Sequence, residues 1–208
     1  MPSVGVFRSL GLFVADDFCT EHDCREYQDA IERGTVEYAA IRTRDSVDEV
    51  NENRRKVHIA EVSTALKSRL KAQLRDVKPS IEAHFHIPLA DCESPQFLTY
   101  GPGHFYVPHT DSTDDAAAPA EIKQRKISVV VFLNASTTTP DSQGYDGGAL
   151  VFYGLIRMAA FAACGLPLEA RAGMLVAFPS NVVHEVRPVT RGRRLTIATW
   201  FPGANAVA

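Results

Sequence analysis

Hydrophobic residues in the first half of the chain recur mainly with the spacing of helices. A leucine returns every four residues after Ser63, which predicts a helix that this serine caps and that has one apolar stripe. The stripe consists of Leu66, Leu70 and Leu74. Pro79 lacks the N–H group that a helix interior needs, so it predicts a kink or an end, with a second helical piece over Ser80–Phe85.

An earlier helix is indicated by a polar start signal and a glycine stop signal. Thr20 with Asp23 three positions later resembles a capping box, and the segment to about Arg33 is followed by Gly34. Residues 36–42 follow as an expected strand. We therefore expect residues 1–95 to form a mainly helical support for the rest of the chain.

The second half changes to short runs that are rich in β-branched and aromatic residues. Turn residues, such as Gly147-Gly148, separate these runs. The expected strands are Gln96–Tyr100, Phe105–Val107, Ile127–Asn134, Ala149–Tyr153, Met174–Phe178 and Arg194–Phe201. Such a series predicts a barrel or a two-sheet jelly roll. Two polar stretches, 112–124 and 135–146, interrupt the series and are expected to be mobile loops beside a site.

Composition narrows the class of protein. The 208 residues are 45% hydrophobic and 23% charged, with a formal net charge of −3, which predicts one globular domain over residues 1–208, with its β-rich core at 96–202. Scattered basic residues predict no nucleic-acid partner. No long apolar run or signal peptide is visible, so no membrane partner is expected. The four cysteines form no CxxC pair and favour free thiols in a reducing cytoplasm.

Three residues could form a metal site. His109 and Asp111 flank one residue at the end of an expected strand, where positions i and i+2 share a face. His184 would approach from a distant strand. Two imidazoles and one carboxylate can bind one face of an octahedral ion, which is typical of non-haem Fe(II) centres. Zinc also accepts these ligands, and ordinary polar residues remain an alternative reading of the pattern.

The last expected strand directs an arginine to one face of the sheet. Alternation places Arg194, Thr196 and Trp200 together, and Arg193 should point the opposite way. A guanidinium inside a barrel needs an anionic partner, and a carboxylate suits its two-pronged geometry. A structural salt bridge or an exposed arginine stays open as an alternative.

Together these residues resemble the Fe(II)- and 2-oxoglutarate-dependent dioxygenases, with the greatest likeness to the prolyl 4-hydroxylase-like branch. The resemblance covers roughly residues 96–202. Besides the possible metal ligands and Arg194, it depends on the runs Tyr100-Gly-Pro-Gly-His-Phe-Tyr106-Val-Pro-His109-Thr-Asp111, Arg125-Lys-Ile-Ser128-Val-Val-Val-Phe132-Leu-Asn134, Gly147-Gly148, Gly173-Met-Leu-Val-Ala-Phe178 and His184–Arg194.

The resemblance implies a double-stranded β-helix and a set of functional residues. His109, Asp111 and His184 would hold Fe(II), and Arg194 would bind the distal carboxylate of 2-oxoglutarate, with Tyr100 and Ser128 as further cosubstrate contacts. The resemblance also places Tyr106 near the substrate; His104, from its closeness to the site, and Trp200, from its place on the face of Arg194, are further candidates for substrate contacts. The implied reaction consumes O2 and 2-oxoglutarate, releases succinate and CO2, and hydroxylates a peptidyl residue, an amino acid or a small molecule. Ascorbate is a further cofactor that the resemblance suggests.

Departures from the branch leave the substrate open. Phe132 stands where a tyrosine is usual, and Gly148 is followed by Ala149-Leu150 instead of Glu-Thr, which weakens the expectation of proline as substrate. The carboxylate Asp111 disfavours halogenation, because halogenases leave that position free for halide. Desaturation and cyclisation stay open, as does the oligomeric state. Two other classes are considered: a non-catalytic β-barrel binding module, and a cupin-like metalloenzyme that does not use 2-oxoglutarate.

Overall fold

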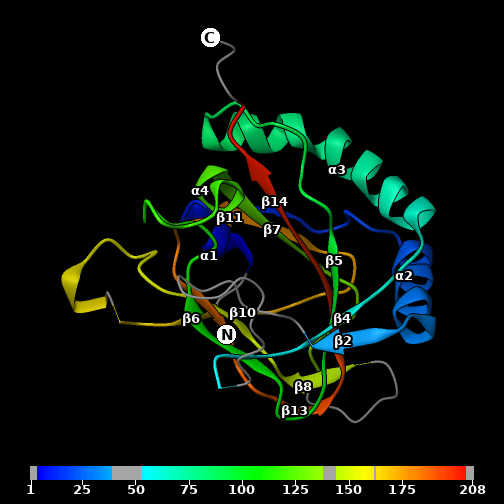
Figure 1. The fold of residues 1–208 in the computed structure, drawn as a ribbon. Helices are drawn as coiled ribbons and strands as arrows, with labels where there is room; N and C mark the ends of the chain where they lie inside the picture. Colours follow the sequence, from blue (N-terminus) through cyan, green and yellow to red (C-terminus); the bar gives the residue numbers. More distant parts are fainter. Residues whose placement is uncertain (1–3, 39–52, 138–143, 162, 205–208) are drawn as a thin grey trace.

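A computed structural model describes residues 4–38, 53–137, 144–161 and 163–204, and most of its strands belong to two antiparallel sheets (Figure 1). The larger sheet contains, in spatial order, β1 (Phe13–Ala15), β11 (Leu175–Pro179), β7 (Arg125–Phe132), β14 (Arg194–Pro202), β5 (Gln96–Tyr100), β4 (His58–Ala60) and β2 (Val36–Tyr38). The smaller sheet contains β10 (Leu166–Leu168), β9 (Leu150–Phe152), β12 (His184–Val186), β6 (Phe105–His109) and β3 (Arg55–Lys56). A two-stranded ribbon joins β13 (Val189–Gly192) to β8 (Tyr145–Gly147). The prediction of a mainly β chain with supporting helices is confirmed.

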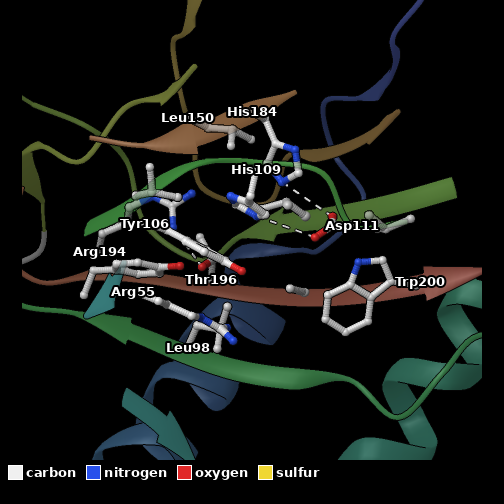
Figure 2. A pocket seen from close by; sticks show the side chains of 15 residues that line it. Arg55, Leu98, Tyr106, His109, Asp111, Leu150, His184, Arg194, Thr196 and Trp200 are labelled. Atoms are coloured by element: carbon white, nitrogen blue, oxygen red, sulfur yellow. Dashed lines mark hydrogen bonds and ion pairs between the residues drawn. The ribbon is translucent and has the colours of Figure 1, made fainter. Parts of the chain in front are cut away.

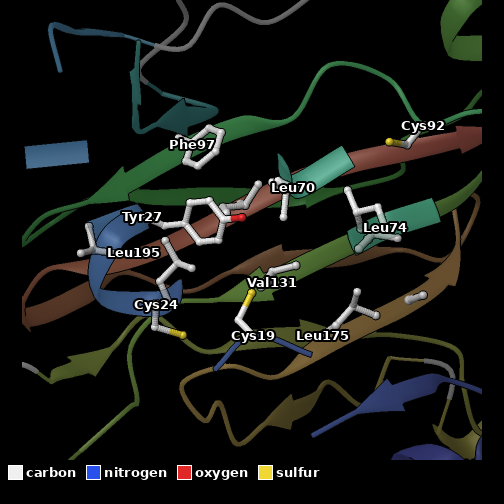
Figure 3. Packing of buried hydrophobic residues seen from close by; sticks show 14 of the residues in the cluster. Cys19, Cys24, Tyr27, Leu70, Leu74, Cys92, Phe97, Val131, Leu175 and Leu195 are labelled. Atoms are coloured by element: carbon white, nitrogen blue, oxygen red, sulfur yellow. The ribbon is translucent and has the colours of Figure 1, made fainter. Parts of the chain in front are cut away.

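Two buried clusters hold the layers together. One lies between the sheets and includes Leu98, Phe132, Phe152 and Phe178. The other lies where the helices α2 (Glu21–Arg33) and α3 (Thr64–Phe85) cover the outer face of the larger sheet. Figure 3 shows Tyr27, Leu70 and Leu74 from these helices in one cluster with Phe97, Val131 and Leu195 from the strands. The odd and even positions of the central strands thus serve two different cores, as strand alternation requires.

The capping signals of the sequence act as predicted. Thr20 and Asp23 form a reciprocal capping box at the start of α2, and Ser63 accepts a hydrogen bond from the backbone N–H of Leu66 at the start of α3. The leucine stripe of α3 is buried, as its spacing predicted.

Pro79 does not divide α3. The helix continues through it to Phe85, so the separate piece expected over Ser80–Phe85 is the last part of the same helix. Pro79 lies on the exposed side, while Leu74 before it and Ile81 after it are buried against the sheet. Packing on both sides of the proline therefore compensates for the single backbone hydrogen bond that it removes.

Besides the helices, residues before 96 also supply short strands to both sheets. β1 and β4 join the larger sheet and β3 joins the smaller one, although only 36–42 was expected to be extended. Of that segment, β2 covers Val36–Tyr38, and residues 39–42 lie outside the described residues. These strands are only two or three residues long, too short for an alternating pattern to be read from the sequence.

The remaining elements are short. α1 (Val4–Ser9) precedes β1, α4 (Ala120–Gln124) ends the polar stretch 112–124, and the 3-10 helix η1 (Ala159–Phe161) lies between β9 and β10. Part of the second polar stretch, 138–143, lies outside the described residues. In the described ranges, no helix combines the length and the apolar character needed to cross a bilayer.

Candidate active site

Strand pairing brings the possible metal ligands together. β12 runs antiparallel to β6, and His184 lies directly opposite His109 in this pair. Asp111 follows two residues after His109. One ligand atom from each of these three side chains lies within 4.8 Å of the others (Figure 2). Residues that are far apart in sequence therefore form one compact donor set.

Backbone carbonyl groups fix the orientation of both imidazoles. His109 Nδ1 lies 2.8 Å from the carbonyl oxygen of Val107, and His184 Nδ1 lies 3.0 Å from that of Val182. Because a carbonyl oxygen only accepts, each Nδ1 must carry a proton, so in the neutral form of each ring the lone pair is on Nε2. The two Nε2 atoms lie 3.6 and 3.5 Å from the oxygens of Asp111. The tautomer with its proton on Nδ1 is the one in which Nε2 can bind a metal ion.

The carboxylate of Asp111 is held from behind. Ser128 Oγ donates to its Oδ2 at 2.7 Å, and the backbone N–H of Asp111 donates to the carbonyl oxygen of Ser180 at 2.8 Å. Ser128, which the resemblance nominated as a cosubstrate contact, does not line the cavity. In the structure the hydroxyl orients a possible metal ligand, and a contact between Ser128 and the cosubstrate stays a prediction.

Charge and burial prepare this donor set for a cation. Burial alone would raise the pKa of Asp111, but electrostatic attraction to His184 and His109 and the hydrogen bond from Ser128 hold it well below its usual range. Burial lowers the pKa of His184 to about 4, although Asp111 opposes the shift. At neutral pH the site therefore offers an ionised carboxylate and a neutral His184, the protonation states that bind metal.

Arg194 points into the same cavity. Its side chain is 2% exposed, and its guanidinium carbon lies 5.0 Å from the ring centre of Tyr100 and 5.2 Å from that of Phe132. Nη1 donates to Thr196 Oγ1 at 3.1 Å. Within the described part of the chain, Nε has no hydrogen-bond partner and no carboxylate pairs with this guanidinium. Burying a cation is costly unless an anion pairs with it, so this guanidinium favours an anionic ligand.

The neighbouring arginine behaves as strand alternation predicts. Arg193 is exposed on the other face and forms an ion pair with Glu32 of α2. The contrast shows that the position of Arg194 follows from the register of β14.

Two features of the sequence hold Arg194 in place. The amide of Asn134 donates to the carbonyl oxygen of Arg193 at 2.8 Å and accepts from the N–H of Leu195 at 3.0 Å, so it clamps the backbone on both sides. This role explains why β7 ends at Phe132 and does not reach Asn134 as predicted. Gly148 has φ +58°, and a Cβ atom there would lie 2.8 Å from Cγ2 of Val189 and 3.2 Å from Cδ of Arg194. A side chain at this position would therefore press on the arginine.

The other nominated residues separate into two groups. Tyr100, Tyr106 and Trp200 line the cavity, and Tyr106 stacks on His109 with ring centres 3.5 Å apart. Burial raises the pKa of Tyr106 to about 12, so its hydroxyl stays protonated. His104 is not among the residues that line the cavity, and its role as a substrate contact stays a prediction. It is buried against the ring of His58, at 4.9 Å between centres.

Sequence reasoning missed Arg55, which also lines the cavity. It lies on a two-residue strand, and no motif marks it. The only available signal was its place in a run of three basic residues, Arg54-Arg55-Lys56, and a run of this length is too short to indicate a face.

Comparison with known proteins identifies the family. The family model described as the 2OG-Fe(II) oxygenase superfamily matches residues 95–202, about half of the chain. The chain therefore belongs to the 2OG-Fe(II) oxygenase superfamily.

Individual relatives agree with this assignment. A PKHD-type hydroxylase of Teredinibacter turnerae is 37% identical over 107 residues, which cover 51% of this chain and 42% of the relative. The chain spans about half the length of the curated relatives that it matches. A crystal structure of a Pseudomonas putida prolyl-4-hydroxylase superposes with a TM-score of 0.69 at 25% identity and covers 97% of both chains.

A prolyl hydroxylase from Trichoplax adhaerens, solved with a peptide fragment of hypoxia inducible factor, has a TM-score of 0.65 at 16% identity, covering 96% of this chain and 87% of that one. This likeness concerns the fold. The structural neighbours have the double-stranded β-helix of 2OG oxygenases, so the predicted fold class is confirmed.

Proposed function

We propose that the protein is an Fe(II)- and 2-oxoglutarate-dependent dioxygenase that hydroxylates its substrate. One observation carries the proposal: a buried arginine without a carboxylate partner in the described ranges shares a cavity with a convergent His-Asp-His set. Neither a binding module nor a cupin-like enzyme needs both features. Membership of the superfamily supports the same conclusion.

The donor set fits Fe(II). His109, Asp111 and His184 would hold the ion, because their ligand atoms converge and both imidazoles present Nε2. Three protein ligands leave positions open for cosubstrate and O2. When bound, the iron supplies the oxidising chemistry, and 2-oxoglutarate leaves as succinate and CO2. Ser128 keeps the carboxylate of Asp111 turned toward the ion.

Arg194 would bind the distal carboxylate of 2-oxoglutarate. Its planar guanidinium can donate two parallel hydrogen bonds to a carboxylate, and the rings of Tyr100 and Phe132 exclude water around it. Thr196, which accepts a hydrogen bond from Nη1, fixes the orientation of the guanidinium. The aromatic surroundings lower the local dielectric, which strengthens this ion pair.

The substrate would enter beside Tyr106 and Trp200, which line the cavity on either side of the triad (Figure 2). Trp200 is kept in place by Arg125, whose guanidinium carbon lies 3.7 Å from the ring centre and whose nitrogens contact Glu93 at 2.7 Å. A peptidyl residue, a free amino acid and a small molecule are all compatible with this opening. The named relatives act as hydroxylases, which favours hydroxylation over desaturation or cyclisation.

The cellular setting is also part of the proposal. Cys19, Cys24, Cys92 and Cys164 are all free thiols. This state suits a reducing compartment such as the cytoplasm. Ascorbate would serve as a reductant that keeps the iron ferrous between turnovers.

The proposal is tested by incubating the protein with Fe(II), 2-oxoglutarate and O2 and measuring succinate. We expect iron-dependent succinate even without the natural substrate, at a slow rate, and none from Asp111→Ala. Succinate formation that persists in Asp111→Ala at the wild-type rate would contradict the assigned metal site.

A further inference from the structure

The cavity contains a second guanidinium that the proposed reaction does not use. Arg55 lies on β3, directly opposite Tyr106 of β6, and lines the cavity together with the triad and Arg194. Directly opposed residues of an antiparallel pair project to the same face of a sheet. The register of this short pairing therefore directs Arg55 to the face that carries the possible metal ligands.

Arg55 is part of a stack that reaches the metal site. Its guanidinium carbon lies 5.0 Å from the ring centre of Tyr106, and that ring lies nearly parallel to His109, with ring centres 3.5 Å apart and planes inclined by 16°. Nη2 also approaches Gln96 Oε1 at 3.4 Å. The aromatic face limits the freedom of the guanidinium and holds it one ring away from a metal ligand.

The two arginines differ in depth. Arg194 is 2% exposed and comes from the larger sheet, whereas Arg55 is only partly buried and comes from the edge strand of the smaller sheet. Figure 2 shows both on the same side of the triad, with Trp200 on the other. The deeper cation suits the ligand that binds first, and the shallower one meets the molecule that enters afterwards.

The charges of the lining residues indicate the kind of molecule. The lining has two positive charges, from Arg55 and Arg194, and one negative charge, from Asp111; its other residues are histidines or uncharged. A divalent ion adds positive charge, and the two carboxylates of 2-oxoglutarate cancel that addition. The part of the lining that the structure describes therefore keeps one positive charge in excess when the cavity is loaded, which favours an anionic group.

We propose that Arg55 binds a carboxylate of the substrate, so that the enzyme acts on small molecules or chain ends that carry a free carboxylate beside the oxidised C–H group. This inference rests on the proposed function, because it assigns the substrate of the same site. Arg55 orients the substrate, and Tyr106 provides the flat wall between the carboxylate subsite and His109.

The test uses matched pairs of probes that differ only in the charge of one group. N-acetyl amino acids, each as the free acid and as the primary amide, are titrated under nitrogen into protein loaded with Mn(II) and 2-oxoglutarate, and binding is followed by calorimetry. For at least one side chain we expect the acid to bind about 10-fold or more tightly than its amide, as one charge-assisted hydrogen-bond pair provides. The same panel is then assayed with Fe(II) and O2 for a mass gain of one oxygen.

Three variants assign the preference to Arg55. Arg55→Gln should reduce the acid-to-amide ratio to about one, and Arg55→Lys, which keeps the charge, should retain part of it. Arg54→Gln is the matched control, because Arg54 is exposed beside Arg55 and should keep the wild-type ratio. Melting temperature and Mn(II) affinity, measured for each variant, reveal any general loss of structure.

Several results would show that Arg55 does not bind a carboxylate of the substrate. A panel in which no acid exceeds its amide, including one in which neither binds, overturns it, as does an unchanged ratio in Arg55→Gln. Loss of 2-oxoglutarate affinity in Arg55→Gln as large as in Arg194→Gln would assign Arg55 to the cosubstrate and also overturn it. Failure of Mn(II) or 2-oxoglutarate to bind the wild-type protein would instead contradict the proposed function.

Discussion

Replacing Arg194 with methionine should stabilise the ligand-free protein while it impairs binding. The guanidinium is 2% exposed, and within the described ranges its Nε lacks a hydrogen-bond partner and no carboxylate pairs with it. A buried charge without a counterion destabilises the folded state, whereas methionine keeps most of the length and packs between the aromatic rings. We expect the free energy of unfolding to rise by roughly 1 kcal/mol.

The same change removes the partner of the distal carboxylate. Charge-assisted hydrogen bonds to a carboxylate contribute about 2–3 kcal/mol in total, so the affinity for 2-oxoglutarate should fall about 30- to 160-fold. Urea unfolding of Mn(II)-loaded protein under nitrogen measures both effects. At a concentration of 100 times the wild-type Kd, 2-oxoglutarate should stabilise the wild type by about 2.7 kcal/mol and the variant by less than about 1 kcal/mol.

Arg193→Met provides the control. Arg193 is exposed and paired with Glu32, and such surface pairs contribute about 0–1 kcal/mol, so both its stability and its response to 2-oxoglutarate should stay near wild type. Equal effects at the two arginines would refute the reasoning from strand faces. A destabilised Arg194→Met with an undiminished response to 2-oxoglutarate would refute the role in binding.

Three further predictions concern the triad and its supports. Asp111→Asn should lower Fe(II) affinity by more than about 100-fold, measured as iron retained after desalting, because loss of a supporting residue alone costs about 10–100-fold. Gly148→Ala should destabilise the fold by about 1–2 kcal/mol and weaken 2-oxoglutarate binding, since its Cβ would press on Arg194. A variant whose unfolding and 2-oxoglutarate affinity, both measured by calorimetry, equal those of the wild type would contradict this. The pKa of His184 is about 4 in the folded protein and 6.5 in the unfolded chain, so between these values only the unfolded state takes up the proton. The free energy of unfolding of the metal-free protein should therefore decrease as the pH is lowered from 6.5 to about 4, by up to about 1.4 kcal/mol per pH unit. His184→Gln should lack this slope.

The parts of the fold with long, regular patterns could be predicted from the sequence. The leucine stripe of α3 and the alternation of β14 each extend over enough residues for one face to be recognised. The short strands β1, β3 and β4 could not be predicted, because two or three residues contain no period. Pro79 misled for a different reason: its effect depends on how the flanking turns pack, which is a tertiary property.

The site shows the same division. The spacing of His109, Asp111 and His184 indicated their convergence, and the register of β12 against β6 provides it. The contacts of Ser128 with Asp111 and of His104 with His58 were not predicted, because position within a motif does not tell which side of a strand meets the cavity. Arg55 was missed because it reaches the cavity through a pairing between distant segments, for which the local sequence carries no signal.

The most direct test of the account is anaerobic equilibrium dialysis of the metal-free protein with Fe(II) and labelled 2-oxoglutarate. The account predicts one iron and one 2-oxoglutarate per wild-type chain, neither in Asp111→Asn, and iron with little 2-oxoglutarate in Arg194→Met. Stoichiometric iron in Asp111→Asn, or 2-oxoglutarate bound to Arg194→Met as tightly as to the wild type, would contradict it.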